Sequence, residues 1–133
     1  MRYCADTWFI IELFAKNSKA LQYIHDAKIG KTRILVPIIV FAEATKKLLQ
    51  RGVSQQVINE FFSGVEASEK IELVLLDKAI AQEAAKISMS FSLPLIDALV
   101  AATSKLTGCD ALLSGDEDYI LLVQKKYLKR ESF

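Results

Sequence analysis

The chain has 133 residues, of which 52% are hydrophobic and 25% are charged, and its formal net charge is only +1. This length predicts a single domain over residues 1–133. The near-neutral charge excludes a globally basic nucleic-acid-binding protein, so any contact with nucleic acid must come from local groups of basic residues. No apolar run is long enough to span a membrane and no signal peptide is recognisable, which predicts a cytoplasmic protein.

Strands and helices alternate from the N-terminus onward. The first half predicts a strand at 2–5 (RYCA), a helix at 8–16, a helix from Ser18 to Gly30, a strand at 33–37 (RILVP), a helix at 38–52 and a helix at 54–68 capped by Ser54. The stretch between Gly52 and Ile71 is long and helical, and we expect it to form a helical pair that projects beside the sheet.

The second half predicts a strand at 71–76 (IELVLL), a helix at 78–91, a helix from Pro94 to Gly108, a strand at 109–114 (CDALLS), a short helix at 116–126 and a basic C-terminus that frays or adds an edge strand. Cys4 and Cys109 fall in the first and fourth strands and are expected to be reduced thiols, while His25 is expected at the surface. Because apolar strands alternate with helices, the predicted fold class is α/β, with a doubly wound parallel sheet flanked by helices.

Acidic residues follow two of the predicted strands. Asp6 ends the first strand, and Asp116 and Asp118 come just after the fourth. In a doubly wound sheet ligands bind at the carboxyl ends of the strands, so these acids meet if the first and fourth strands are neighbours. Glu43 and Asp97 are lone acids in apolar stretches of helix, where a buried carboxylate must be paired or bind a cation.

Each of these acids also has a purely structural explanation. Asp6 can cap a helix, Glu43 can pair with Lys47 one turn further on, and Asp97 falls in a first helical turn. These explanations do not account for a convergence of all the acids at one edge. Carboxylates about 4 Å apart repel by roughly 4 kcal/mol at an effective dielectric of about 20. A hard divalent ion, Mg²⁺ or Mn²⁺, would compensate this repulsion and support hydrolysis of a phosphodiester.

Three segments carry a resemblance to a known family. The stretches ADTWFIIELF, VPIIVFAEATKKLL and LPLIDALVAATSKLTGCDALLSGDEDY are similar to the acid-bearing segments of the PIN-domain family, and specifically of VapC-type toxins, in order and spacing. The resemblance covers nearly the whole chain. It implies a magnesium-dependent endoribonuclease, the toxin of a type II toxin–antitoxin pair, which forms a homodimer and is inhibited by a cognate antitoxin protein.

The resemblance also assigns roles to individual residues. The four catalytic and metal-binding acids fall on Asp6, Glu43, Asp97 and Asp116, with Asp118, Ser114 and Thr7 as auxiliary residues. The sequence departs from the family pattern in three places, which are Trp8 where a small polar residue is common, Gly115 where a basic residue is common, and Tyr119 where phenylalanine is frequent. These departures concern substrate preference rather than the metal site.

Two basic clusters are candidates for RNA binding. One comprises Lys46, Lys47 and Arg51, and the other comprises Lys125, Lys126, Lys129 and Arg130. In the acidic turn we expect Asp116 to be the fourth acid of the site, because it is nearer the strand. Asp118 would then cap backbone amides or position a second ion, and Glu117 would face solvent.

Two other functions are compatible with acids at strand ends. A receiver-like signalling domain would need a phosphorylatable aspartate at the end of its central third strand, a position that Asp77 occupies. A catalytically inactive PIN-like RNA-binding module is the second alternative, against which the complete set of acids argues.

Overall fold

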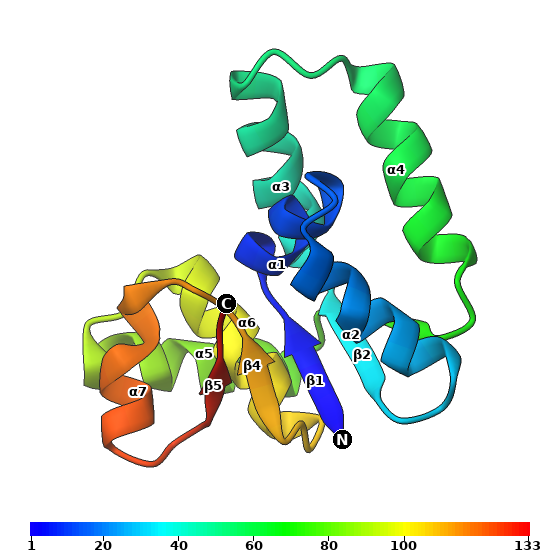
Figure 1. The fold of residues 1–133 in the computed structure, drawn as a ribbon. Coiled ribbons are helices and arrows are strands. Elements are labelled where there is room, and N and C mark those ends of the chain that lie inside the picture. Colours follow the sequence, from blue (N-terminus) through cyan, green and yellow to red (C-terminus); the bar gives the residue numbers. More distant parts are fainter.

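Five parallel strands form one sheet in the order β3-β2-β1-β4-β5 (Figure 1). The computed structural model describes all 133 residues, and the strands are β1 (Arg2–Ala5), β2 (Arg33–Pro37), β3 (Ile71–Val74), β4 (Ala111–Leu113) and β5 (Arg130–Glu131). The chain starts at the central strand, runs outward to β3 and returns to place β4 on the other side of β1. This arrangement confirms the predicted doubly wound parallel sheet, and the basic C-terminus does add an edge strand.

Helices cover both faces of the sheet. They are α1 (Thr7–Phe14), α2 (Ser18–Lys28), α3 (Ile39–Gln50), α4 (Gln55–Ala67), α5 (Lys78–Phe91), α6 (Leu95–Leu106), the short 3₁₀ helix η1 (Glu117–Tyr119) and α7 (Ile120–Gln124). In Figure 1, α5, α6 and α7 lie together on one side, α1 and α2 lie on the other, and α3 and α4 project beyond the sheet. None of these helices has the length and apolar character needed to cross a bilayer.

The longest continuous run of buried residues lies where α6 packs on β1 and β4. Every residue from Asp97 to Ser104 is buried, and α6 packs against both β1 and β4. Three of these residues, Ala98, Ala101 and Ala102, are small, which lets the helix approach the sheet closely. Because this stretch of α6 is buried, Asp97, the one carboxylate that the helix carries, is held at the carboxyl edge of the sheet.

Several helices begin at the capping residues that their sequences predict. The side chain of Asp6 accepts a hydrogen bond at the start of α1, as Ser54 does at the start of α4. Helix α2 differs, because Asn17 caps it by accepting from the Lys19 amide at 2.9 Å, and Ser18 is its first helical residue. At the carboxyl end of α6, Gly108 adopts φ +69°, which suits its predicted role as a helix stop.

Two local predictions were wrong. The segment 52–68 contains one continuous helix, α4, rather than a helical pair, and the projecting pair consists of α3 and α4 (Figure 1). Nothing in Gln55–Ala67 interrupts the helix, since its one glycine, Gly64, stays helical. Cys109 lies in the turn before β4 and not in the strand, and it is a free, partly buried thiol, whereas Cys4 is fully buried in β1.

Candidate metal centre

The adjacent strands β1 and β4 bring the first and last acidic segments to the same edge. Their register pairs Ala5 with Leu113, so Asp6 and Ser114 follow at equivalent positions, and the Asp6 amide donates to the Leu113 carbonyl at 3.3 Å. The condition under which these acids meet, that the first and fourth strands are neighbours, is therefore fulfilled. The edge lies at the point where the strand order reverses, which is where doubly wound folds form their binding crevice.

Asp6 links the first helix to the acidic turn. Its carboxylate is 4% exposed and accepts hydrogen bonds from the Phe9 amide at 3.1 Å and from the Ser114 hydroxyl. The Ser114 oxygen in turn accepts from the Asp116 amide at 3.0 Å. Burial raises the pKa of Asp6 to about 7, although these two hydrogen bonds oppose the rise. Asp6 is thus both the cap of α1 and a neighbour of the turn that carries Asp116.

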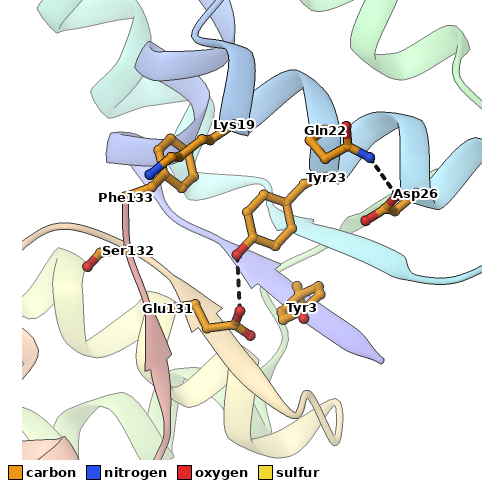
Figure 2. A pocket seen from close by; sticks show the side chains of 8 residues that line it. All are labelled: Tyr3, Lys19, Gln22, Tyr23, Asp26, Glu131, Ser132 and Phe133. Atoms are coloured by element: carbon orange, nitrogen blue, oxygen red, sulfur yellow. Dashed lines mark hydrogen bonds between the residues drawn. The ribbon is translucent and has the colours of Figure 1, made fainter.

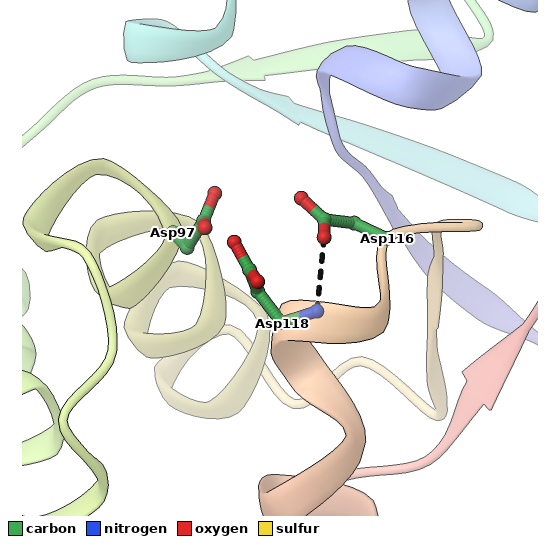
Figure 3. A group of neighbouring side chains, drawn as sticks. All are labelled: Asp97, Asp116 and Asp118. Atoms are coloured by element: carbon green, nitrogen blue, oxygen red, sulfur yellow. Dashed lines mark hydrogen bonds between the residues drawn. The ribbon is translucent and has the colours of Figure 1, made fainter.

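Three carboxylates face one another across this edge (Figure 3). One oxygen each from Asp97, Asp116 and Asp118 lies within 4.8 Å of the others. Burial and, after it, the charge of Asp116 together raise the pKa of Asp97 to about 7. The Tyr119 hydroxyl, which is buried, donates to Asp97 Oδ1 at 3.4 Å and orients it. Such a group of acids is the arrangement that a divalent cation would compensate.

The acidic turn changes conformation between its two aspartates. Asp116 is still extended and caps η1 by accepting from the Asp118 amide at 2.9 Å, so the capping role expected for Asp118 belongs to Asp116. Asp118 lies one residue into the 3₁₀ turn, and both carboxylates point toward Asp97 (Figure 3). Glu117 points outward with its side chain 79% exposed, as predicted.

A cavity of about 250 Å³ adjoins the acids, between α1 and α3. It is lined by Asp6, Thr7, Trp8, Ile11, Glu12, Glu43, Lys47, Arg51 and Asp116. The hydroxyl of Thr7 is buried without a hydrogen-bond partner. Glu43 is half-buried and lies 3.9 Å from Lys47, so the local ion pair considered from the sequence is present, but both residues also face the cavity. Lys46 is exposed and does not line it.

The second basic cluster does not act as a unit. Lys126 and Lys129 line a separate cavity of about 560 Å³ that also contains Cys109, at the amino end of β4 and hence at the opposite edge of the sheet. Arg130 instead donates to the Asp116 carbonyl at 2.8 Å and lies 3.6 Å from Glu117. Among Lys126, Lys129 and Arg130, only Arg130 therefore reaches the acidic turn.

Sequence reasoning missed three features of the site. Nothing in the sequence indicated that the Tyr119 hydroxyl would contact Asp97. Sequence reasoning placed Arg130 in a candidate RNA-binding cluster, and not beside the acidic turn. Glu12 lines the cavity because it lies one helical turn after Trp8 on the same face of α1, a spacing that the sequence does contain.

A receiver-like arrangement is contradicted by the topology. The third strand, β3, is at the edge of the sheet and not at its centre. Asp77, the residue that would be phosphorylated, caps α5 by accepting from the Ile80 amide at 2.8 Å.

Comparison with known proteins establishes the family. The PIN domain family matches residues 3–125, so the chain belongs to this family. Among solved structures, VapBC2 of Rickettsia felis, bound to a DNA fragment from its promoter, matches with a TM-score of 0.76 and 14% identity over 99% of this chain and 98% of that chain. VapBC-1 of nontypeable Haemophilus influenzae matches with a TM-score of 0.72 and 16% identity over 99% and 98% of the two chains.

VapC20 of Mycobacterium tuberculosis, described as a sarcin-ricin loop cleaving toxin, matches with a TM-score of 0.69 and 13% identity over 90% of this chain and 93% of that chain. No curated protein sequence gives a significant match. At these low identities the structural likeness establishes the fold, and the activity has to be argued from the site itself.

Proposed function

We propose that the protein is a divalent-metal-dependent endoribonuclease and the toxin of a toxin–antitoxin pair. The observation that carries this proposal is the group formed by Asp97, Asp116 and Asp118, whose carboxylate oxygens lie within 4.8 Å of one another at the carboxyl edge of β1 and β4. Membership of the PIN domain family and a fold shared with VapC proteins support it.

The donor set suits Mg²⁺ or Mn²⁺. Both ions prefer carboxylate oxygens, whereas zinc sites usually contain cysteine or histidine. The buried, unpartnered Thr7 hydroxyl is a second sign that the site is built for a ligand, because buried polar groups are normally hydrogen-bonded. In our proposal Asp97 and Asp116 are direct ligands, Asp118 assists, and Asp6 and Glu43 complete the acidic site from the wall of the cavity.

When bound, the ion would lower the pKa of a coordinated water and stabilise negative charge on the phosphate. The side chains of the protein would position the phosphate groups and the metal ligands. Lys47 and Arg51, which line the cavity on α3, would bind phosphate groups beside the acids. The Thr7 hydroxyl would hydrogen-bond a water or a substrate oxygen, and the Tyr119 hydroxyl would keep Asp97 oriented.

Cleavage of a labelled single-stranded RNA during a titration with Mg²⁺ or Mn²⁺ tests this proposal. We expect no cleavage in excess EDTA and recovery when either ion is added back. Cleavage that continues undiminished in excess EDTA would contradict the metal-dependent mechanism.

We also propose that α1, α3 and α4 form the surface that binds an antitoxin. Phe14 contacts Phe61 edge to face at 5.3 Å between ring centroids, and Phe41 stacks on Phe62 at 4.6 Å. These rings are only partly buried, and exposed Leu49 and Val57 extend the apolar surface along the projecting pair. Such a surface suits an amphipathic segment of a partner protein.

A homodimer is the third part of the proposal. Met89, at the end of α5, is 81% exposed, and Leu95, at the start of α6, is 57% exposed. Exposed apolar side chains at this corner of the molecule are the kind of surface that a second copy would cover.

A further inference from the structure

The glycine in the acidic turn is required by a neighbouring side chain. A Cβ atom added to Gly115 would lie 2.5 Å from Trp8 Cε2 and 2.6 Å from Trp8 Nε1. The φ angle of Gly115 is not in the left-handed region, so its backbone conformation does not demand glycine. The missing side chain instead allows the turn to lie directly against the indole ring.

The indole is itself held in place by the C-terminal segment. Trp8 packs on Phe133 with 4.8 Å between ring centroids, and Phe133 stacks on Tyr23 of α2 at 5.9 Å. The Tyr23 hydroxyl donates to Glu131 at 3.0 Å, beside the cavity of about 440 Å³ shown in Figure 2. These contacts fix the position of Trp8 relative to α2 and β5.

The turn is also tied directly to β5. The Ser114 amide donates to the Glu131 carbonyl at 3.0 Å, and Arg130 donates to the Asp116 carbonyl at 2.8 Å. The Arg130 side chain is only 16% exposed, so both its burial and its bond to the Asp116 carbonyl restrict its movement. The turn therefore contacts an aromatic ring at Gly115 and a guanidinium group at Asp116.

Such restraint matters because like charges meet at this turn. The carboxylate oxygens of Asp116 and Asp97 lie within 4.8 Å of each other, so their like charges repel and act to push the turn away from α6 when no cation is bound. An ion that binds through these carboxylates gains affinity if the protein holds them together in advance.

We propose that Trp8 is a positioning residue, which holds the turn so that Asp116 faces Asp97 in the metal site. This inference rests on the proposed function, since it concerns the same site. It also explains two departures from the family pattern as one coupled pair, because the indole at position 8 occupies the space that a side chain at position 115 would need.

Binding of Mn²⁺, measured by the electron paramagnetic resonance signal of the free ion, tests the coupling. We expect Gly115→Ala to weaken binding about tenfold, equivalent to about 1.4 kcal/mol. In a Trp8→Ala background, where the indole is absent, the same Gly115→Ala change should alter affinity less than about twofold. Gly64→Ala is the matched control, because nothing lies within 4 Å of its added Cβ, and it should change nothing in either background.

Circular dichroism and thermal unfolding in EDTA establish that each variant is folded. If Trp8→Ala does not fold, Trp8→Phe provides a smaller ring that still packs on Phe133. If Gly115→Ala weakens Mn²⁺ binding equally in both backgrounds, or does not weaken it in the parent protein, the positioning role of Trp8 is overturned but the proposed metal site is not. A parent protein that binds no Mn²⁺ overturns the proposed metal site, and with it this inference.

Discussion

Asp97 is the residue at which burial and like charge combine most strongly. It is 9% exposed, and the charges of Asp116, Glu43 and Asp118 all act on it. Asp97→Asn keeps the volume and the contact with Tyr119 but removes the charge. We expect this change to abolish metal-dependent cleavage and to stabilise the metal-free protein at pH 8 by about 1 kcal/mol or more, since a tenfold difference in proton affinity corresponds to about 1.4 kcal/mol.

Urea unfolding in EDTA measures the stability, and RNA cleavage measures the activity. Glu117→Gln is the matched control, because it removes a neighbouring charge whose side chain is 79% exposed, and it should change both quantities little. A marked loss of stability in Asp97→Asn without metal would mean that Asp97 has a structural role instead.

The raised pKa values of Asp6 and Asp97 make the metal-free protein sensitive to pH. Both rise from 3.8 to about 7, so between these values the folded state binds more protons than the unfolded state. The stability that these two carboxyl groups contribute is therefore fully present below about pH 4, and it is lost as the pH rises through about 7. We expect the free energy of unfolding in EDTA to decrease from pH 5 to pH 8.

Millimolar Mg²⁺ should restore stability at pH 8 more than at pH 5, because the ion competes with protons for the same carboxylates. Urea titrations across this range, with and without Mg²⁺, measure the effect. A free energy that rises with pH in EDTA would show that other groups dominate, and an unchanged slope in Asp97→Asn would exclude Asp97 as a source.

At the scale of elements, α3 separates basic residues that the sequence groups together. Lys47 and Arg51 face the cavity beside the acids, whereas Lys46 points to solvent. We expect Lys47→Ala and Arg51→Ala each to weaken RNA binding and to reduce the dependence of log K on log salt by about 1, and Lys46→Ala to do neither.

Fluorescence anisotropy with an uncleavable oligoribonucleotide at several salt concentrations measures both quantities. Equal effects of Lys46→Ala and Lys47→Ala would mean that RNA runs along the outside of α3 and not into the cavity.

Local chemistry explains how far the sequence predicted these elements. The sequence signals that were interpreted correctly act between near neighbours: the apolar strands, the caps at Asp6 and Ser54, and the stop at Gly108. The doubly wound class of fold followed from them, whereas the strand order did not. The contact between Trp8 and Gly115, and the bond from Arg130 to the Asp116 carbonyl, join residues distant in the chain. No periodicity or propensity encodes such contacts, so sequence reasoning read each residue alone.

The edge of the sheet at which the acidic residues gather was predictable from the local strand signals. Parallel strands place their carboxyl ends at one edge, which brings Asp6 and Asp116 near each other once β1 and β4 are neighbours. The orientation of Asp118 was not predictable, because it depends on the residue at which the extended chain becomes a 3₁₀ turn.

At the scale of the whole molecule, the projecting pair of α3 and α4 is the surface that we propose for an antitoxin. Val57 is 44% exposed on α4, so Val57→Asp should leave the fold intact while burying a charge in the complex. We expect this variant to lose co-purification with the cognate antitoxin. Leu121→Asp is the control, since Leu121 is 45% exposed on α7, and retention of the partner by both variants would argue against this surface.

The proposed homodimer concerns a different corner of the molecule. Met89→Lys combined with Leu95→Lys places two charges where exposed apolar side chains stand, and we expect the variant to be monomeric by light scattering. Leu121→Lys should leave the dimer unchanged. A parent protein that is monomeric at high concentration would contradict the dimer altogether.

The distance along the chain between Asp6 and Asp116 has a consequence for synthesis. The ribosome produces β1, β2 and β3 long before β4, which must then insert beside β1 to bring the two acidic segments together. A nascent chain therefore carries an incomplete site until Asp118 has been made. Termination of translation anywhere before Asp116 leaves a product that lacks two of the three grouped carboxylates.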